Sequence, residues 1–188
     1  GMIPPGDFLS SLEETGLILP VGRWVLEEAC RQAAIWAGQT PSGQTPLRVT
    51  LNVSPRQIGQ SDFVDDLSNA IESSAVDPSL IYLELTETAL IADPRAAWTA
   101  LSAARQLGVG MALDDFGTGF SSLSHLRNFD FELLKLDSTY VGGLGERPTD
   151  EAIVRHVASL ARALGIATVA EGVQDGDQVE RLLEIGCE

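Results

Sequence analysis

From Leu47 onward, short runs rich in β-branched and aliphatic residues alternate with longer amphipathic stretches. Strands joined by helical crossovers lie parallel, so this alternation predicts an α/β fold. The expected strands cover residues 47–54, 81–87, 110–116, 131–137 and 167–173. The expected helices cover residues 61–75, 94–107, 121–127, 150–164 and about 175–185, and two more precede the first strand.

Polar side chains near the carboxyl ends of the expected strands favour one α/β architecture over another. An open doubly wound sheet and a (β/α)8 barrel both fit the alternation. A barrel brings all strand ends to one mouth, whereas an open sheet spreads them along a line. Every expected strand carries a polar residue at this level, which favours the barrel. These residues are Asn52, Glu84, Asp114 with Asp115, Lys135 with Asp137, and Glu171.

The barrel that the sequence predicts is incomplete. Eight strands ordinarily need about 250 residues, whereas the chain has 188 residues. We therefore expect one partial domain over residues 1–188, from which a strand at each end of the barrel is missing.

Charge and composition narrow the function classes. The formal net charge of −15 argues against a basic surface for DNA or RNA polymers. An acidic protein can still hold a phosphate compound through a divalent cation. No apolar run has the ~20 residues of a membrane span, and Cys30 and Cys187 lack metal or redox spacing. The expected location is the cytoplasm, with membrane tethering of a full-length protein left open.

The adjacent acids Asp114 and Asp115 are the most informative short motif. Like charges side by side are costly unless positive charge lies between them. Each acid alone has a structural interpretation, as a helix cap or a buried acid. The pair precedes Gly117, Thr118 and Gly119, where glycine lets the backbone turn sharply. If Asp114 bridges two cations ~3.5–4 Å apart, Asp115 becomes a ligand rather than a repulsive neighbour.

The other strand-end residues have two interpretations each. Asn52 is either a buried structural amide or a ligand. Glu84 faces the barrel interior, where an isolated carboxylate is rare unless it is paired or metal-bound. Lys135 and Asp137 share a strand face, either as an interior salt bridge or as catalytic groups. Glu171 resembles the other strand-end acids.

A faint internal repeat relates two of these acids. Residues 104–114 and 161–171 align without gaps, and Asp114 falls on Glu171. The alignment predicts that two strand–helix units present an acid at the same level of the fold.

Carboxylates, a carboxamide and a lysine make up the candidate site. All-oxygen ligands select hard cations such as Mg²⁺, Mn²⁺ or Ca²⁺. Two such ions can activate water and stabilise the leaving oxygen in phosphodiester hydrolysis. The sequence contains no Ser/His/Asp, Cys/His or HExxH arrangement and no P-loop.

These motifs resemble the EAL domain, the cyclic di-GMP phosphodiesterase family, in the family's order across essentially the whole chain. The resemblance implies a modified TIM barrel that hydrolyses cyclic di-GMP to linear pGpG with Mg²⁺ or Mn²⁺ in bacterial signal transduction. The matching stretches are GMIPPGDFLSSLEETGLILPVGRWVLEEA, LNVSPRQ, ELTET, DDFGTGFSSL, KLD and AEGV.

Roles carried over by position are implied by the resemblance alone. Asn52, Glu84 and Asp114 look like ligands of one metal, and Asp114 with Asp115 like ligands of a second. Lys135 would hold the catalytic water. The implied general base, or water-mediated ligand, is Glu171. The implied supporting residues are Glu87, which would anchor the loop after Asp115, and Asp137, Gly117, Thr118 and Gly119.

The chain also departs from the family pattern. The Glu-Ala-Leu motif that should precede Gly1 is absent, as is the strand with a metal-site Gln that should follow Glu188. Gln174 stands where Glu is usual. We therefore expect this fragment alone to bind metal poorly and turn over little substrate.

Two alternative functions stay open. One is a catalytically inactive cyclic di-GMP receptor, and the other is a dimerisation module. An enolase-type barrel does not match the motif order. The resemblance leaves room for a homodimer through the loop and helix after Asp115, and for an upstream sensor or GGDEF domain.

Overall fold

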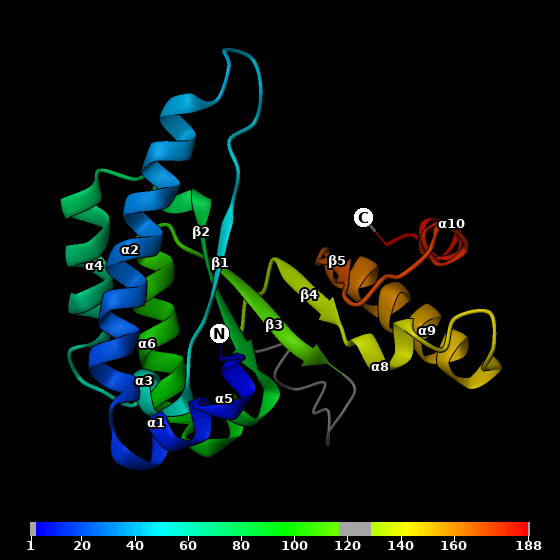
Figure 1. Cartoon of the computed structure of the whole chain (residues 1–188), viewed down its shortest axis with the longest axis horizontal. Helices are drawn as coiled ribbons and strands as arrows, with labels where there is room; N and C mark the ends of the chain where they lie inside the picture. The colour runs from blue at the N-terminus through cyan, green and yellow to red at the C-terminus, as the bar shows by residue number, and fades with distance from the viewer. Residues whose placement is uncertain (1–2, 117–128, 188) are drawn as a thin grey trace. The chain divides into compact units, whose positions relative to one another are not determined.

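The computed structural model describes residues 3–116 and 129–187. In this part of the chain, five parallel strands form one sheet in the order β1-β2-β3-β4-β5, and Figure 1 shows the strands and helices. Each strand lies within an expected range, so the predicted α/β class is confirmed. The strands are β1 Val49–Asn52, β2 Ile81–Thr86, β3 Gly110–Phe116, β4 Leu133–Leu136 and β5 Ala167–Ala170.

The longer helices lie at the expected positions, whereas three short helices over residues 55–58, 87–92 and 138–141 were not expected from the sequence. The expected helix over residues 121–127 lies outside the described residues. No helix in the described ranges combines the length and apolar character needed to cross a membrane. The α-helices are α1 Leu9–Thr15, α2 Ile18–Gln39, α3 Pro55–Ile58, α4 Phe63–Ser74, α5 Glu87–Ala92, α6 Pro94–Gln106, α8 Ser138–Val141, α9 Pro148–Leu164 and α10 Gly176–Ile185, and two 3₁₀ helices are η1 Pro5–Asp7 and η2 Pro78–Leu80.

The chain divides into two compact units. The first unit is Gly1–Leu83 with Thr88–Gly110, and the second unit is Glu84–Glu87 with Met111–Glu188. The division falls inside β2, so Glu84 belongs to the second unit. Each unit has its own buried apolar core.

In the first unit, α2 packs on α4, and α4 packs on α6 (Figure 1). α2 turns one apolar face inward, with Leu26 and Cys30 fully or almost fully buried. Asp93 starts α6 as an N-cap, because its carboxylate accepts hydrogen bonds from the backbone N–H groups of Arg95 and Ala96. Pro94 follows at the first helical position, where its missing N–H is harmless.

In the second unit, β4 pairs with β3 on one side and with β5 on the other, parallel in both cases. α9 packs on β5 and on α8. The β4–β5 register is regular, with Lys135 opposite Val169 and Leu136 opposite Ala170. This regular register places the carboxyl ends of β4 and β5 at one level. The residues that directly follow the two strands therefore lie side by side.

Candidate active site

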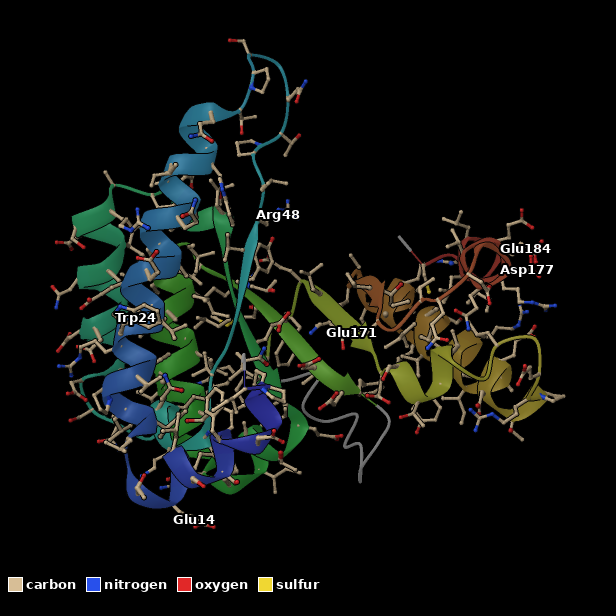
Figure 2. The ribbon with its side chains drawn as sticks, in the orientation of Figure 1. Glu14, Trp24, Arg48, Glu171, Asp177 and Glu184 are labelled. Atoms are coloured by element: carbon tan, nitrogen blue, oxygen red, sulfur yellow. The ribbon has the colours of Figure 1, made fainter. Side chains whose placement is uncertain are left out.

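The ammonium group of Lys135 in β4 contacts carboxylates from three other parts of the second unit. Its Nζ lies 3.2 Å from Glu84 Oε1, 3.0 Å from Asp114 Oδ1 and 2.6 Å from Glu171 Oε1. Glu84 lies in β2, Asp114 in β3, and Glu171 directly follows β5. Figure 2 shows Glu171 beside β4. The structure therefore brings together four residues that the sequence selected separately, and we call them the Lys135 cluster.

Burial strengthens the electrostatic interactions within the Lys135 cluster. Glu84 and Asp114 are 4% and 8% exposed, whereas the side chain of Glu171 is 40% exposed. Burial alone would lower the pKa of Lys135. Hydrogen bonds to Glu171 and Asp114 outweigh that effect, so the pKa of Lys135 lies above that of an ordinary lysine. Lys135 is thus a permanent cation at neutral pH that donates hydrogen bonds and cannot act as a base.

The acid pair lies on a β-bulge. In the β3–β4 register, Leu113 pairs with Leu134 and Phe116 with Leu136, so two residues of β3 face Lys135 alone. Adjacent side chains of a regular strand point to opposite faces, and an extra residue breaks that rule. Asp115 takes the left-handed conformation with φ of +54°, and its backbone N–H donates to Asp114 Oδ1 at 3.1 Å. The bulge is what allows two consecutive acids to serve one site.

Negative charge is in excess around Asp115. Partial burial raises the pKa of Asp115, and the carboxylates of Asp114, Asp137 and Glu171 raise that pKa further. Three acids close enough to act on one carboxyl exceed what a single lysine neutralises. Asp115 therefore lies in a region of net negative charge.

Asp137 has a structural role, as a helix cap, that the sequence analysis did not identify. It directly follows β4 and caps α8, accepting a hydrogen bond from the backbone N–H of Thr139 at 2.8 Å. Hydrogen bonds from Thr139 lower the pKa of Asp137. The interior salt bridge considered for Lys135 and Asp137 is wrong, because Lys135 pairs with Glu84, Asp114 and Glu171 instead.

The remaining candidates lie in different parts of the chain. Glu87 is buried at the start of α5 in the second unit. Asn52 is the exposed last residue of β1 and belongs to the first unit, so its role as a ligand stays a prediction. Gly117, Thr118 and Gly119 lie outside the described residues.

Sequence reasoning missed a buried glutamine beside the site. Gln178 is 7% exposed in α10 and hydrogen-bonds to the segment that begins with Glu171. The signal was present: Asp175 and Gln178 have the spacing of a helix N-cap and its third residue. The structure shows Asp175 as that N-cap, accepting from the backbone N–H of Gln178 at 2.9 Å.

The donor chemistry of the Lys135 cluster fits a hard divalent cation. Carboxylate oxygens are the preferred ligands of Mg²⁺ and Mn²⁺, and the raised pKa of Asp115 marks negative charge that Lys135 leaves uncompensated. In residues 3–116 and 129–187, no group of three or more His, Cys, Asp or Glu side chains is arranged as a metal site. The ammonium nitrogen lies within hydrogen-bonding distance of Glu84, Asp114 and Glu171 and already supplies them with positive charge.

Replacing Asp115 with asparagine should stabilise the fold at neutral pH. Asparagine tolerates a positive φ as aspartate does, so the change isolates the charge. Because the pKa of Asp115 is raised, the folded state favours the protonated carboxyl. The protein therefore becomes less stable as pH rises through that pKa and Asp115 becomes charged. We expect the melting temperature of Asp115→Asn to exceed that of the wild type by about 1–3 °C at pH 7. The difference should vanish near pH 3, and an equal gain at both pH values would contradict this origin.

Comparison with known proteins adds the family context. The sequence matches the model of the EAL domain over residues 1–188. MucR of Pseudomonas aeruginosa, a bifunctional diguanylate cyclase/cyclic di-GMP phosphodiesterase, is 38% identical over 187 residues. The cyclic di-GMP phosphodiesterase PdeR of Escherichia coli is 38% identical over 178 residues. These alignments cover 100% and 95% of this chain but only 27% and 26% of the relatives, so the chain spans about a quarter of their length.

Solved structures agree with the fold. A structure described as PaMucR phosphodiesterase in complex with c-di-GMP matches with a TM-score of 0.93 at 38% identity, covering 100% of this chain and 75% of that one. The EAL domain of Mycobacterium smegmatis DcpA matches with a TM-score of 0.80 at 36% identity, covering 88% of this chain and 74% of that one. The predicted fold class, part of a TIM-type α/β barrel, is confirmed.

Proposed function

The chain belongs to the EAL domain family, and from that premise we propose that it hydrolyses cyclic di-GMP to linear pGpG as part of a metal-dependent phosphodiesterase. The observation that carries the proposal is the Lys135 cluster, in which one buried lysine contacts Glu84, Asp114 and Glu171 within 3.2 Å. Each of these side chains stands at a position that the family resemblance assigned to catalysis or metal binding.

The cation requirement follows from charge. Cyclic di-GMP carries two phosphodiester charges, and the chain carries a formal net charge of −15. Glu84, Asp114 and Asp115 would hold Mg²⁺ or Mn²⁺. When bound, these ions make water more acidic and stabilise the oxygen that leaves phosphorus.

The protein's own groups would handle the water and its proton. Lys135 remains protonated and donates hydrogen bonds, so it can orient the attacking water but cannot deprotonate it. Glu171 is the more exposed acid of the Lys135 cluster and can accept the proton from that water. The water oxygen bonds to phosphorus, the bond to the 3′ oxygen breaks, that oxygen takes a proton from solvent, and the ring opens to pGpG with a 5′ phosphate.

Hydrolysis by the full-length protein tests this function. Incubation of cyclic di-GMP with the full-length protein and Mg²⁺ or Mn²⁺ should yield pGpG, resolved by liquid chromatography. Excess EDTA should stop the reaction, and added Mn²⁺ should restore it. Cyclic di-GMP binding without pGpG would contradict the proposal in favour of a receptor. If the protein neither binds nor hydrolyses cyclic di-GMP, a dimerisation module is the function that remains. The isolated 188-residue chain should show little turnover.

A further inference from the structure

Gln178 links two segments of the second unit through one buried amide. Its Oε1 accepts a hydrogen bond from the backbone N–H of Gln174 at 2.7 Å. Its Nε2 donates to the backbone carbonyl of Val141 at 3.3 Å. Since the side chain is 7% exposed, breaking either bond would leave a polar group without water to replace its partner.

The two segments that Gln178 joins both bear acids of the candidate site. Gln174 lies in the stretch between β5 and α10, which begins with Glu171. Val141 ends α8, and that short helix directly follows β4 and its cap Asp137. The side chain of Gln178 therefore holds the segment of Glu171 against the segment that continues from Lys135.

Close backbone packing shows that the spacing of these segments is tight. Gly172 adopts a φ of +70°, and a Cβ there would lie 2.5 Å from the Cβ of Ser138, the first residue of α8. Outward movement of the stretch after β5 would break this packing together with the hydrogen bond from Gln174 to Gln178.

Glu171 depends on such support because it lies beyond the end of β5. Its backbone N–H still donates to the carbonyl of Leu136 at 3.1 Å. However, its side chain is 40% exposed, and one ion pair does little to fix a flexible, partly exposed side chain. We propose that Gln178 is a positioning residue that holds the Glu171 carboxylate on the ammonium group of Lys135, an inference that rests on the proposed hydrolysis.

Replacing Gln178 with methionine tests the inference, because methionine keeps the length and removes both hydrogen bonds. In the full-length protein, kcat should fall about 10–100-fold, while KM for cyclic di-GMP should change by less than about twofold. A purely structural defect would instead reduce the folded fraction, measured by circular dichroism, and kcat per folded molecule would stay at the wild-type value.

Hydrogen exchange supplies a readout that needs no turnover. In the full-length protein, the hydrogen-bonded backbone amides of Glu171 and Gln174 should exchange at least about tenfold faster in Gln178→Met, with exchange in α9 unchanged. If the methionine variant does not fold, Gln178→Glu keeps the length and the acceptor for Gln174. That variant replaces the donor to Val141 with a carboxylate oxygen, which the Val141 carbonyl repels, so it should still lower kcat.

Thr168→Val is the matched control. Thr168 is 4% exposed in β5, and its hydroxyl interacts with the Cys187 thiol. The change therefore removes a buried polar contact of the same unit away from residues 171–174, and kcat should stay at the wild-type value. Equal kcat in Gln178→Met and Thr168→Val, or unchanged exchange at residues 171–174, would overturn the inference. A wild-type protein that makes no pGpG would instead overturn the proposed function, and the exchange result would still decide the role of Gln178.

Discussion

Replacing Lys135 with methionine should lower the free energy of unfolding by about 3–5 kcal/mol, and the melting temperature by about 6–20 °C. The reason is the carboxylates that the change leaves behind. Glu84 and Asp114 are almost completely buried, and without the ammonium group their charges would have no direct partner. Buried charges that lose their counter-charge cost far more than exposed ones.

The pH dependence of this loss follows from the raised pKa of Lys135. A lysine whose pKa is higher in the folded state contributes stability in full below the unfolded value of about 10.4. That contribution is lost only as pH rises through the higher folded value. The difference between wild type and Lys135→Met should therefore be nearly constant from pH 7 to pH 9.

Arg155→Met is the control for Lys135→Met. Arg155 also makes an ion pair, to Glu151 Oε1 at 3.0 Å, but its side chain is 56% exposed. Thermal unfolding followed by circular dichroism should show a loss of less than about 1 kcal/mol for this change. Equal losses in the two variants would show that the Lys135 cluster is no more than a surface ion pair.

Asp114→Asn should abolish turnover of cyclic di-GMP while the fold survives. Asparagine has the same shape and can still accept the hydrogen bond from the backbone N–H of Asp115. It cannot supply the charge that pairs with Lys135 at 3.0 Å or that would bridge two cations. Loss of an outer partner of a metal site costs about 10–100-fold, so loss of a direct ligand should exceed about 100-fold.

Initial rates of pGpG formation by the full-length protein at fixed Mg²⁺ measure this effect. Asp177→Asn is the matched control, because Asp177 is exposed in the first turn of α10 (Figure 2). Its rate should equal that of the wild type. Undiminished turnover by folded Asp114→Asn would remove the two-metal assignment.

Local signals in the sequence were sufficient to locate the strands and the longer helices, but not the short helices α3, α5 and α8. The helices expected over residues 94–107 and 150–164 are α6 and α9; Asp93 caps the start of α6, and Gly165 ends α9 with a φ of +74°. The expected strands at residues 47–54 and 167–173 were longer than β1 and β5. Composition does not mark where the strand pairing ends, because pairing depends on the neighbouring strand.

The internal repeat predicted one long-range relationship. It placed Asp114 and Glu171 at the same level of the fold, and both carboxylates contact the Nζ of Lys135. Equivalent positions in different strand–helix units share a level because the units repeat the same geometry. The repeat could not indicate that one lysine lies between them.

The sequence by itself determined the α/β class, the order of the elements and the acids at their ends, because hydrophobic periodicity, caps and turn residues act over a few neighbouring residues. Only the tertiary structure decided how those acids are used. The bulge at Asp114 and Asp115 depends on register with β4, the contacts of Lys135 join residues distant in the chain, and Gln178 acts through a backbone carbonyl that has no sequence signature. Such features arise from pairing and packing between segments, which local patterns do not encode.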